Sequence, residues 1–469
     1  MEQITGFPKN LAYNLKRLQG SIIKQKINIS ADKSSYNANE RAMFNFPIGR
    51  MVDNRSICLT AKCSTQTNGN FFPRGGLNSL IENLQITANS RIIQSTQYYN
   101  YIWNCIADIS GYFSVEQAGK RLYENFDPSI VHTNPQGEGT IATTNACITT
   151  GSTSSYYFTV NNWLGFFSSS CSTWNTNDLG QVQLILTFAP DAVLWLAAPN
   201  TPAANAGADP GTYKVEDLNL SMDTITFTES LYYDLVKTQL EGAGLNIAYH
   251  DYLVSVGNSV AKSTTGITHT AQFSTNSLDM VFATFRTSLY NTANVLLLAN
   301  ATVATTTATI GGSSKTYTEV ISNHLSNEDT HAGFNQSRYF QRDGGGIDYS
   351  SWYINSSPFT ANSTPIQIYN NTLQAFDYLN VDIGTGSLHG GALTTGIYNR
   401  YYFIDALSLE NISGDGNSWV SGLGSGGGVT QISYNARFKT LTDNVFPIIV
   451  GKVSKIMNIK IGRNIDIME

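Results

Sequence analysis

The sequence is poor in charged residues and contains no long apolar run. Only 13% of its 469 residues are charged, about half the usual share, and the formal net charge is −6. This acidic balance argues against nucleic-acid binding by the body of the protein, because phosphate contacts require a surplus of Lys and Arg. No apolar stretch approaches the roughly 18 residues that span a bilayer, and the N-terminal segment lacks the apolar run of a signal peptide. We therefore expect synthesis in a cytosol-like compartment without secretion.

Cysteine and histidine are scarce and form no recognisable ligand set. The chain has five Cys and six His. Cys58 and Cys63 form a weak metal pair without a second pair, so small buried side chains are the better interpretation. His324 and His331 come nearest to a metal cluster, but their spacing fits no strong ligand pattern. We expect no metal site and no cofactor.

Catalytic motifs are missing as well. No G-x-S-x-G segment occurs, which leaves a serine hydrolase of that type unsupported. The glycine-rich segment GLGSGGG at 422–428 precedes a strand-like segment, whereas a phosphate-binding loop precedes a helix. The carboxylates are scattered, and no pair can be placed face to face. We predict no catalytic residue and no enzyme activity.

The sequence does contain many segments in which apolar and polar residues alternate, as in half-buried β-strands. Phe44 and Phe46 fall on one face of such a segment. Residues 181–189 (QVQLILTFA) predict a strand with Val182, Leu184, Leu186 and Phe188 on one side. Residues 213–228 (YKVEDLNLSMDTITFT) predict a long strand, and a second long strand is expected at the C-terminal end. The pattern favours an all-β protein.

An eight-residue segment occurs nearly twice. Residues 87–94 read TANSRIIQ and residues 360–367 read TANSTPIQ, with six of eight positions identical. We interpret each as the tip of a β-hairpin, because Asn tolerates the left-handed backbone of a tight turn. A short helix is expected after each hairpin, from the apolar spacing within 98–106 and 368–379. The repeat suggests a duplication, with one copy in each half.

The shared order of elements suggests three segments. Residues 1–26 form a basic arm, in which residues 9–23 have helical apolar spacing. Residues 229–241 predict a helix that ends at Gly242. We place the domain boundary there, with one domain at 27–241 and the other at 242–469. The arm either packs on its own domain or reaches a neighbouring protein, a membrane or a nucleic acid.

Three segments together resemble a known family: FNFPIGRMVDNRS at 44–56, GGLNSLIENLQITANSRIIQSTQYYNYI at 75–102 and SWYINSSPF at 351–359. They are similar to the double jelly-roll major capsid proteins of the adenovirus, virophage and polinton-like lineage of double-stranded DNA viruses. The family's hairpin motif and the following Tyr-containing helix match Ile86, Asn89, Ile92 and Tyr99. The resemblance implies two tandem eight-stranded jelly rolls with long loops and a few short helices.

The same resemblance implies a function. Three chains would form a homotrimeric, pseudo-hexagonal capsomer, and capsomers would assemble into an icosahedral shell in the virion. The loops at 120–180 and 300–345 would form the outward tower and the subunit contacts. The arm would lie on the inner side, near neighbouring capsomers, a membrane or the genome. Penton and minor capsid proteins would be further partners, and synthesis would take place in the host cytoplasm.

The alternative is a receptor- or glycan-binding β-sandwich protein, such as a phage or surface adhesin or a lectin, because jelly rolls serve both roles. Trp163, Trp174 and Trp419 would stack on sugars if they are exposed, and would only pack if they are buried. A glycoside hydrolase on a β-sandwich would require a close carboxylate pair in a cleft.

Overall fold

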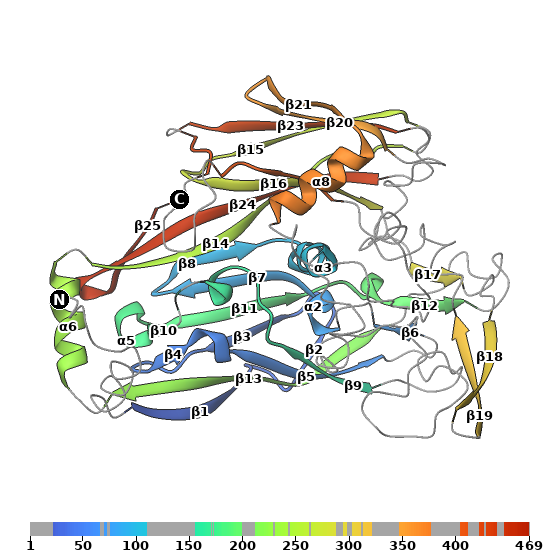
Figure 1. Cartoon of the computed structure of the whole chain (residues 1–469). Helices are drawn as coiled ribbons and strands as arrows, with labels where there is room; N and C mark the ends of the chain where they lie inside the picture. The colour runs from blue at the N-terminus through green and yellow to red at the C-terminus, as the bar shows by residue number, and fades with distance from the viewer. Residues whose placement is uncertain are drawn as a thin grey trace, which may run out of the picture.

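The computed structural model places most of the chain in antiparallel β-sheets (Figure 1). The described residues are 22–65, 70–72, 76–109, 155–169, 171, 173–198, 212–227, 230–242, 244–261, 264–287, 294–297, 303–310, 313–320, 347–376, 404–410, 422–425, 428–438 and 445–468. The predicted arm lies outside them up to residue 21, and residues 22–26 are the start of the first strand. His324, His331 and Trp419 also lie outside the described residues.

Two sheets are built from the first half of the chain. One sheet centres on the long strand β13, and its members are β1 (Ile22–Ser30), β2 (Ser35–Asn37), β4 (Met51–Asp53), β5 (Cys58–Thr65), β9 (Ser155–Val160), β10 (Thr173–Asn175) and β13 (Tyr213–Phe227). The other has the order β3-β11-β7-β8, with β3 (Arg41–Asn45), β11 (Val182–Phe188), β7 (Ile81–Ala88) and β8 (Arg91–Thr96). The order β1-β13-β5-β9 facing β3-β11-β7-β8 is the strand order of a jelly roll.

The second half repeats this order. One sheet runs β14-β24-β16-β22, with β14 (Leu245–Val256), β24 (Val445–Lys460), β16 (Leu278–Thr287) and β22 (Asp405–Ser408). Its partner runs β15-β23-β20-β21, with β15 (Gly266–Phe273), β23 (Thr430–Phe438), β20 (Ile347–Ile354) and β21 (Ser357–Ser363). The first strand of each half pairs with its last long strand, β1 with β13 and β14 with β24. The predicted pair of jelly rolls is confirmed.

Helices and minor strands complete the chain. The helices are α2 (Leu77–Leu80), α3 (Tyr99–Ile109), α5 (Thr176–Leu179), α6 (Ser230–Glu241) and α8 (Pro365–Ala375), with single turns η1 (Asn54–Ser56), η2 (Phe166–Ser168), η3 (Asp191–Val193) and η9 (Ile461–Arg463). The minor strands are β6 (Asn70–Phe71), β12 (Trp195–Ala198), β17 (Asn294–Leu297), β18 (Val303–Ile310), β19 (Ser313–Val320) and β25 (Asn464–Met468). The helices predicted after the two hairpins and before Gly242 are therefore present as α3, α8 and α6.

Both halves contain a hairpin with a two-residue turn. In β7–β8 the turn is Asn89-Ser90, with φ values of 47° and 66°, and in β20–β21 it is Asn355-Ser356, with 48° and 68°. Positive φ at both central residues matches the twist of the strands that the turn joins. The first TANS segment is a hairpin tip, as predicted.

The prediction of a second hairpin tip at TANS 360–363 is wrong. Residues 360–363 lie inside β21, and the turn falls earlier, at Asn355. The structural counterpart of ANSRI is thus INSSP at 354–358, and the near-identity of the two TANS segments is a coincidence of composition. The duplication is preserved in backbone geometry and not in that repeat.

The C-terminal segment also departs from the expected single long strand. The chain reverses at η9, where Gly462 has a φ of 77°, and β25 returns antiparallel to β24. A left-handed glycine at this point permits the tight reversal. The strand β24 therefore ends at Lys460.

The turn in the second hairpin makes a first prediction. We expect Ser356→Val to lower the free energy of unfolding by about 1–2 kcal/mol, because a β-branched residue is strained at the positive φ of this position. The control is Ser357→Val, on the adjacent strand residue, which should change stability by less than about 0.5 kcal/mol. Urea denaturation checks both variants, and equal losses would contradict the assigned turn.

Candidate functional site

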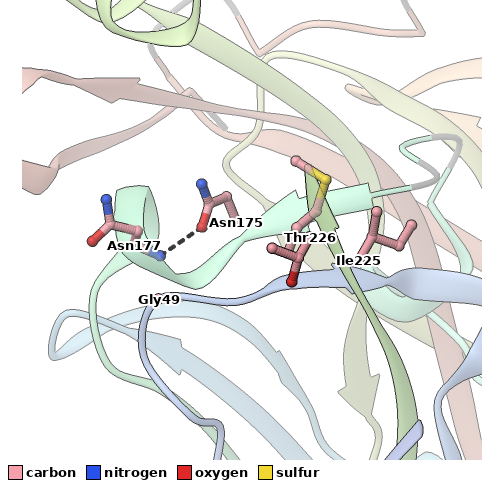
Figure 2. Close-up of a pocket in the computed structure, with 6 residues that line it drawn as sticks. Gly49, Asn175, Asn177, Ile225 and Thr226 are labelled. Carbon is pink, nitrogen blue, oxygen red and sulfur yellow. Dashed lines mark hydrogen bonds between the residues drawn. The ribbon is translucent and has the colours of Figure 1, made fainter. Parts of the chain in front are cut away.

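A hollow in the described part of the chain is too small for a typical ligand site. It lies between β4, α5 and the end of β13 and holds about 100 Å³, whereas ligand pockets usually reach about 300–1,000 Å³. Its lining is uncharged and consists of Gly49, Met51, Asn175, Asn177, Ile225 and Thr226. Figure 2 shows one hydrogen bond between its two asparagines, in which the backbone N–H of Asn177 donates to Asn175 Oδ1 at 2.9 Å. Nothing in this hollow provides an acid, a base or a nucleophile.

One cluster has the composition of a catalytic triad but not its geometry. Ser454 Oγ donates directly to Asp279 Oδ2 at 2.6 Å. The same nitrogen of His250, Nδ1, lies 3.3 Å from that hydroxyl oxygen and 3.5 Å from that carboxylate oxygen. In a triad the imidazole stands between the hydroxyl and the carboxylate, so that it can accept the hydroxyl proton. Burial alone would raise the pKa of Asp279, but hydrogen bonds from His250, Ser454 and Ser277 outweigh it and lower the pKa. The cluster fixes a buried carboxylate in place.

Metal and membrane sites are equally unsupported within the part of the chain that the structure describes. Cys58 and Cys63 both lie on β5, five positions apart, which directs their side chains to opposite faces. Burial raises the pKa of the Cys63 thiol. No group of three or more His, Cys, Asp and Glu residues there is placed to hold a metal ion. In the same residues, no helix is both long enough and apolar enough to span a bilayer.

The tryptophans that were candidates for sugar stacking are buried where they are described. Trp163 is 3% exposed and Trp174 is 2% exposed. The indole N–H of Trp163 donates to the carbonyl of Ile57, and that of Trp174 donates to Asn54 Oδ1. Both rings therefore serve packing within the first jelly roll.

The two jelly rolls meet along a seam of packed side chains. Figure 1 shows four stacked layers, in which the β14-β24-β16-β22 sheet lies between the β3-β11-β7-β8 sheet and the β15-β23-β20-β21 sheet. A single hydrophobic cluster runs from the core of the first jelly roll into the second half. Its members from the second half are Ile247, Tyr249, Tyr252, Met280, Phe282, Ile404, Ala406, Ile448, Val450, Met457, Ile459 and Ile465.

Tyrosine hydroxyls tie the two sides of the seam together. The Tyr249 hydroxyl on β14 donates to the carbonyl of Ile93 on β8 at 2.8 Å, and its ring meets Phe166 edge-on. The Tyr101 hydroxyl on α3 donates to the carbonyl of Phe285 on β16 at 2.7 Å. Each tyrosine buries an aromatic ring and satisfies its polar end, so the two jelly rolls are held in one relative position.

A buried ion pair lies beside these tyrosines. Lys455 Nζ on β24 is 3.1 Å from Asp251 Oδ2 on β14, and the two side chains are 8% and 3% exposed. Thr96 on β8 donates to the other oxygen of Asp251 at 3.3 Å. Burial raises the pKa of Asp251, and the ammonium group of Lys455 offsets only part of that effect. The carboxylate thus accepts partners from both jelly rolls.

At the end of the seam near the first hairpin turn, the contacts are polar and exposed to solvent. Asn89, at the tip of the first hairpin, donates through Nδ2 to the carbonyl of Arg463 at 3.1 Å. Arg463 in turn donates through Nε to the carbonyl of Asn177 at 2.9 Å. The turn η9 of the second half is therefore held between the first hairpin and α5.

A third buried carboxylate, after those of Asp279 and Asp251, lies inside the second jelly roll. Asp405 on β22 is 2% exposed, and it accepts hydrogen bonds from the Ser350 hydroxyl and the Trp352 indole N–H on β20. Burial raises the pKa of Asp405, and the two hydrogen bonds counter it incompletely. No other carboxylate is among the described groups that shift the pKa of Asp405, so it has no partner for a glycosidase pair there.

Comparison with known proteins shows which solved structures share this architecture. No protein-family model and no curated protein sequence matches the chain. Among solved structures, VP54 of PBCV-1, fitted into a reconstruction of the virophage Sputnik, superposes with a TM-score of 0.58 at 11% identity, covering 96% of this chain and 97% of that one. The Sputnik virophage structure gives 0.54 at 11% identity, with coverage of 96% and 89%. The Faustovirus major capsid protein gives 0.52 at 11% identity, with coverage of 94% and 91%.

These likenesses extend over nearly the whole chain, so both halves and their arrangement are shared. The chain is an all-β, double jelly-roll protein. Its fold is that of the double jelly-roll major capsid proteins of the adenovirus, virophage and polinton-like lineage, as the sequence resemblance implied. At 11% identity this fold is carried by pattern and not by shared residues.

The ion pair at the seam makes a second prediction. Lys455→Met should lower the free energy of unfolding by about 3–5 kcal/mol, because it leaves the buried Asp251 carboxylate without its cation. The matched control is Lys460→Met, which breaks an exposed pair with Asp466 and should cost less than about 1 kcal/mol. Adding Asp251→Asn to Lys455→Met should restore part of the loss. Similar losses from the two lysine variants would contradict a buried pair at this seam.

Asp405 makes a third prediction, on pH. Because its folded pKa is raised above the ordinary 3.8, its contribution to stability is fully present below 3.8 and is lost as the pH rises through the folded value. Asp405→Asn should remove this dependence, so its stability relative to the natural chain should grow as the pH rises. Ser350→Ala, which keeps the carboxylate, should retain the dependence. Urea denaturation across a pH series measures all three, and parallel curves for Asp405→Asn and the natural chain would exclude a raised pKa.

Proposed function

We propose that this protein is a viral major capsid protein whose homotrimer forms a pseudo-hexagonal capsomer of an icosahedral shell. The observation that carries the proposal is the seam: two jelly rolls of equal topology stand side by side and share one continuous apolar cluster. Such a protomer is a rigid block with two similar lobes. Three blocks of two lobes give a six-lobed outline, which packs a hexagonal surface.

The composition agrees with this role. With 13% charged residues, flat flanks can approach copies of themselves without strong repulsion between like charges. Jelly rolls also leave few open strand edges for wrong pairing. Solved proteins of this fold include the Faustovirus major capsid protein, which supports a place in the virion shell.

The segments are assigned accordingly. We propose that the two jelly-roll domains are residues 22–241 and 242–469, and that residues 1–21 form an arm on the inner side of the shell. The expected boundary at residue 27 moves to 22 because β1 begins at Ile22. Synthesis in the host cytoplasm without secretion is part of the same proposal. Partners are further copies of the chain, with penton and minor capsid proteins, and through the arm a membrane or the genome. We propose no enzymatic activity, no cofactor and no catalytic residue.

The receptor- or glycan-binding alternative is weaker than it was from the sequence alone. Two of its three candidate stacking residues, Trp163 and Trp174, are buried and hydrogen-bonded. No observation on the described residues favours it independently.

A fourth prediction tests the proposed assembly. Native mass spectrometry of the purified chain should give a stable species of three times the 51.2 kDa protomer, and negative-stain images of it should be hexagonal. A protomer that stays single at high concentration would overturn the capsomer. Binding to a glycan array by a monomer would instead favour the adhesin.

A further inference from the structure

The first hairpin carries an irregularity at the seam. Within the β7–β8 ladder, Ile92 and Gln94 pair with consecutive residues of β7, so Ile93 is the extra residue of a β-bulge. A bulge turns its extra residue out of the regular alternation of the strand. Here it directs Ile93 into the seam, where the side chain is 1% exposed and the carbonyl accepts the Tyr249 hydroxyl of the second half. The bulge is therefore part of the contact between the jelly rolls.

The second hairpin has the same bulge at the same distance from its turn. Pro358 and Thr360 pair with consecutive residues of β20, which leaves Phe359 as the extra residue. Phe359 is thus the counterpart of Ile93, yet it is 55% exposed. The first half uses this position for its contact with the second half. In the second half, the described residues of the chain leave a large apolar side chain there more than half exposed.

The helices after the two hairpins differ in the same way. The start of α3 is buried, and Tyr101 reaches across the seam to Phe285. At the start of α8, Ile366 is 66% exposed and Gln367 is also exposed. Phe359, Ile366 and the exposed residues of β21 form one surface at the end of the second jelly roll, which we name the outer hairpin surface. Figure 1 shows β21 at the end of the stack that lies away from the first jelly roll, whereas α8 lies beside β16 and β24.

The seam also indicates what this surface fits. The first hairpin docks against β14, the first strand of the second jelly roll. The counterpart of β14 in the first jelly roll is β1, since each pairs with the last long strand of its own jelly roll. Ile23, near the beginning of β1, is 56% exposed and lies on the same face as Ile27 and Ile29, which pack against the core. The same holds in β14. Tyr249 contacts the first jelly roll, and Leu253, further along the strand, packs against the core of the second jelly roll.

We propose that the outer hairpin surface binds the β1 region of a second copy of this chain, with Phe359 set against Ile23, and so repeats between chains the contact that the seam makes within one. This inference rests on the proposed function and assigns its subunit contact. The contact is heterologous, because the second jelly roll of one copy meets the first jelly roll of the next. Seam and subunit contact then alternate around a closed ring of two-lobed chains.

The first test removes the apolar side chain. Phe359→Asp should convert the trimer to a folded monomer in native mass spectrometry, with an unchanged circular dichroism spectrum, because the side chain is exposed within one chain. The thermal midpoint should fall, since the monomer loses the stabilisation that assembly adds. The control is Ile461→Asp, at an equally exposed apolar residue on η9, which should leave the trimer intact. If the Phe359→Asp trimer dissociates only at the same low protein concentration as the natural trimer, the assignment is overturned.

The second test detects the contact directly. Ile23→Cys together with Phe359→Cys should give, on mild oxidation, disulfide-linked species of two and three chains that disappear on reduction. Each single variant supplies the background from the natural cysteines, and Ile48→Cys with Phe359→Cys is the control pair, since Ile48 is exposed on a different part of the first half. Cross-linking no greater than in the control pair would place the contact elsewhere.

The two levels of the proposal fail in different ways. If the natural chain is a monomer, the capsomer itself is wrong. If the natural chain is a trimer that tolerates Phe359→Asp and shows no specific cross-link, the capsomer stands and only the outer hairpin surface is wrong.

Discussion

The fold depends on one sheet that must be covered on both faces. Neighbouring residues of β16 alternate between two cores: Val281 and Phe285 belong to the core of the second jelly roll, whereas Phe282 belongs to the cluster shared with the first. A sheet that is apolar on both faces cannot leave either face in water without exposing a patch that would aggregate. The second jelly roll therefore cannot end at its own outer face, and the first is the layer that completes it.

Apolar burial alone does not fix how two flat layers sit on each other, because it has no direction. The seam supplies direction through polar groups with few acceptable partners. A hydroxyl such as that of Tyr249 must reach a carbonyl, and the Asp251 carboxylate must remain near both Lys455 and Thr96. Any sliding of the layers would leave these groups buried and unsatisfied, at a cost of about 1–3 kcal/mol for each neutral group. The layers therefore have a single register, as a repeating shell would require of its subunit.

The sequence predicted the class, the strands and the helices because alternation and helical spacing record burial directly. The segments that became β11, β13 and α6 were placed within a residue or two. The second hairpin was misplaced, since TANS at 360–363 carries the same letters as the first turn while Asn355-Ser356 carries the backbone conformation. The seam could not be found from the sequence, because Asp251 and Lys455 become a pair only when β14 meets β24, some 200 residues further along the chain. A charged residue at a core-facing position of an otherwise apolar strand was the available signal.

The hairpins show what a duplication preserves when residue identity is lost. Turn and bulge recur at equal spacing, with φ values at the two turns that differ by only a few degrees. Both turns are Asn-Ser, whereas the residues that follow them differ, with RII at 91–93 and SPF at 357–359. The bulge directs its extra residue toward the neighbouring layer, and it does so whatever the side chain is. Backbone geometry can therefore persist while the residues change. Ile93 and Phe359 then differ in what covers them and not in how they are held. Ile93 is buried because the second half of the chain covers it. The same backbone geometry leaves Phe359 55% exposed, and we propose that a second copy of the chain covers it.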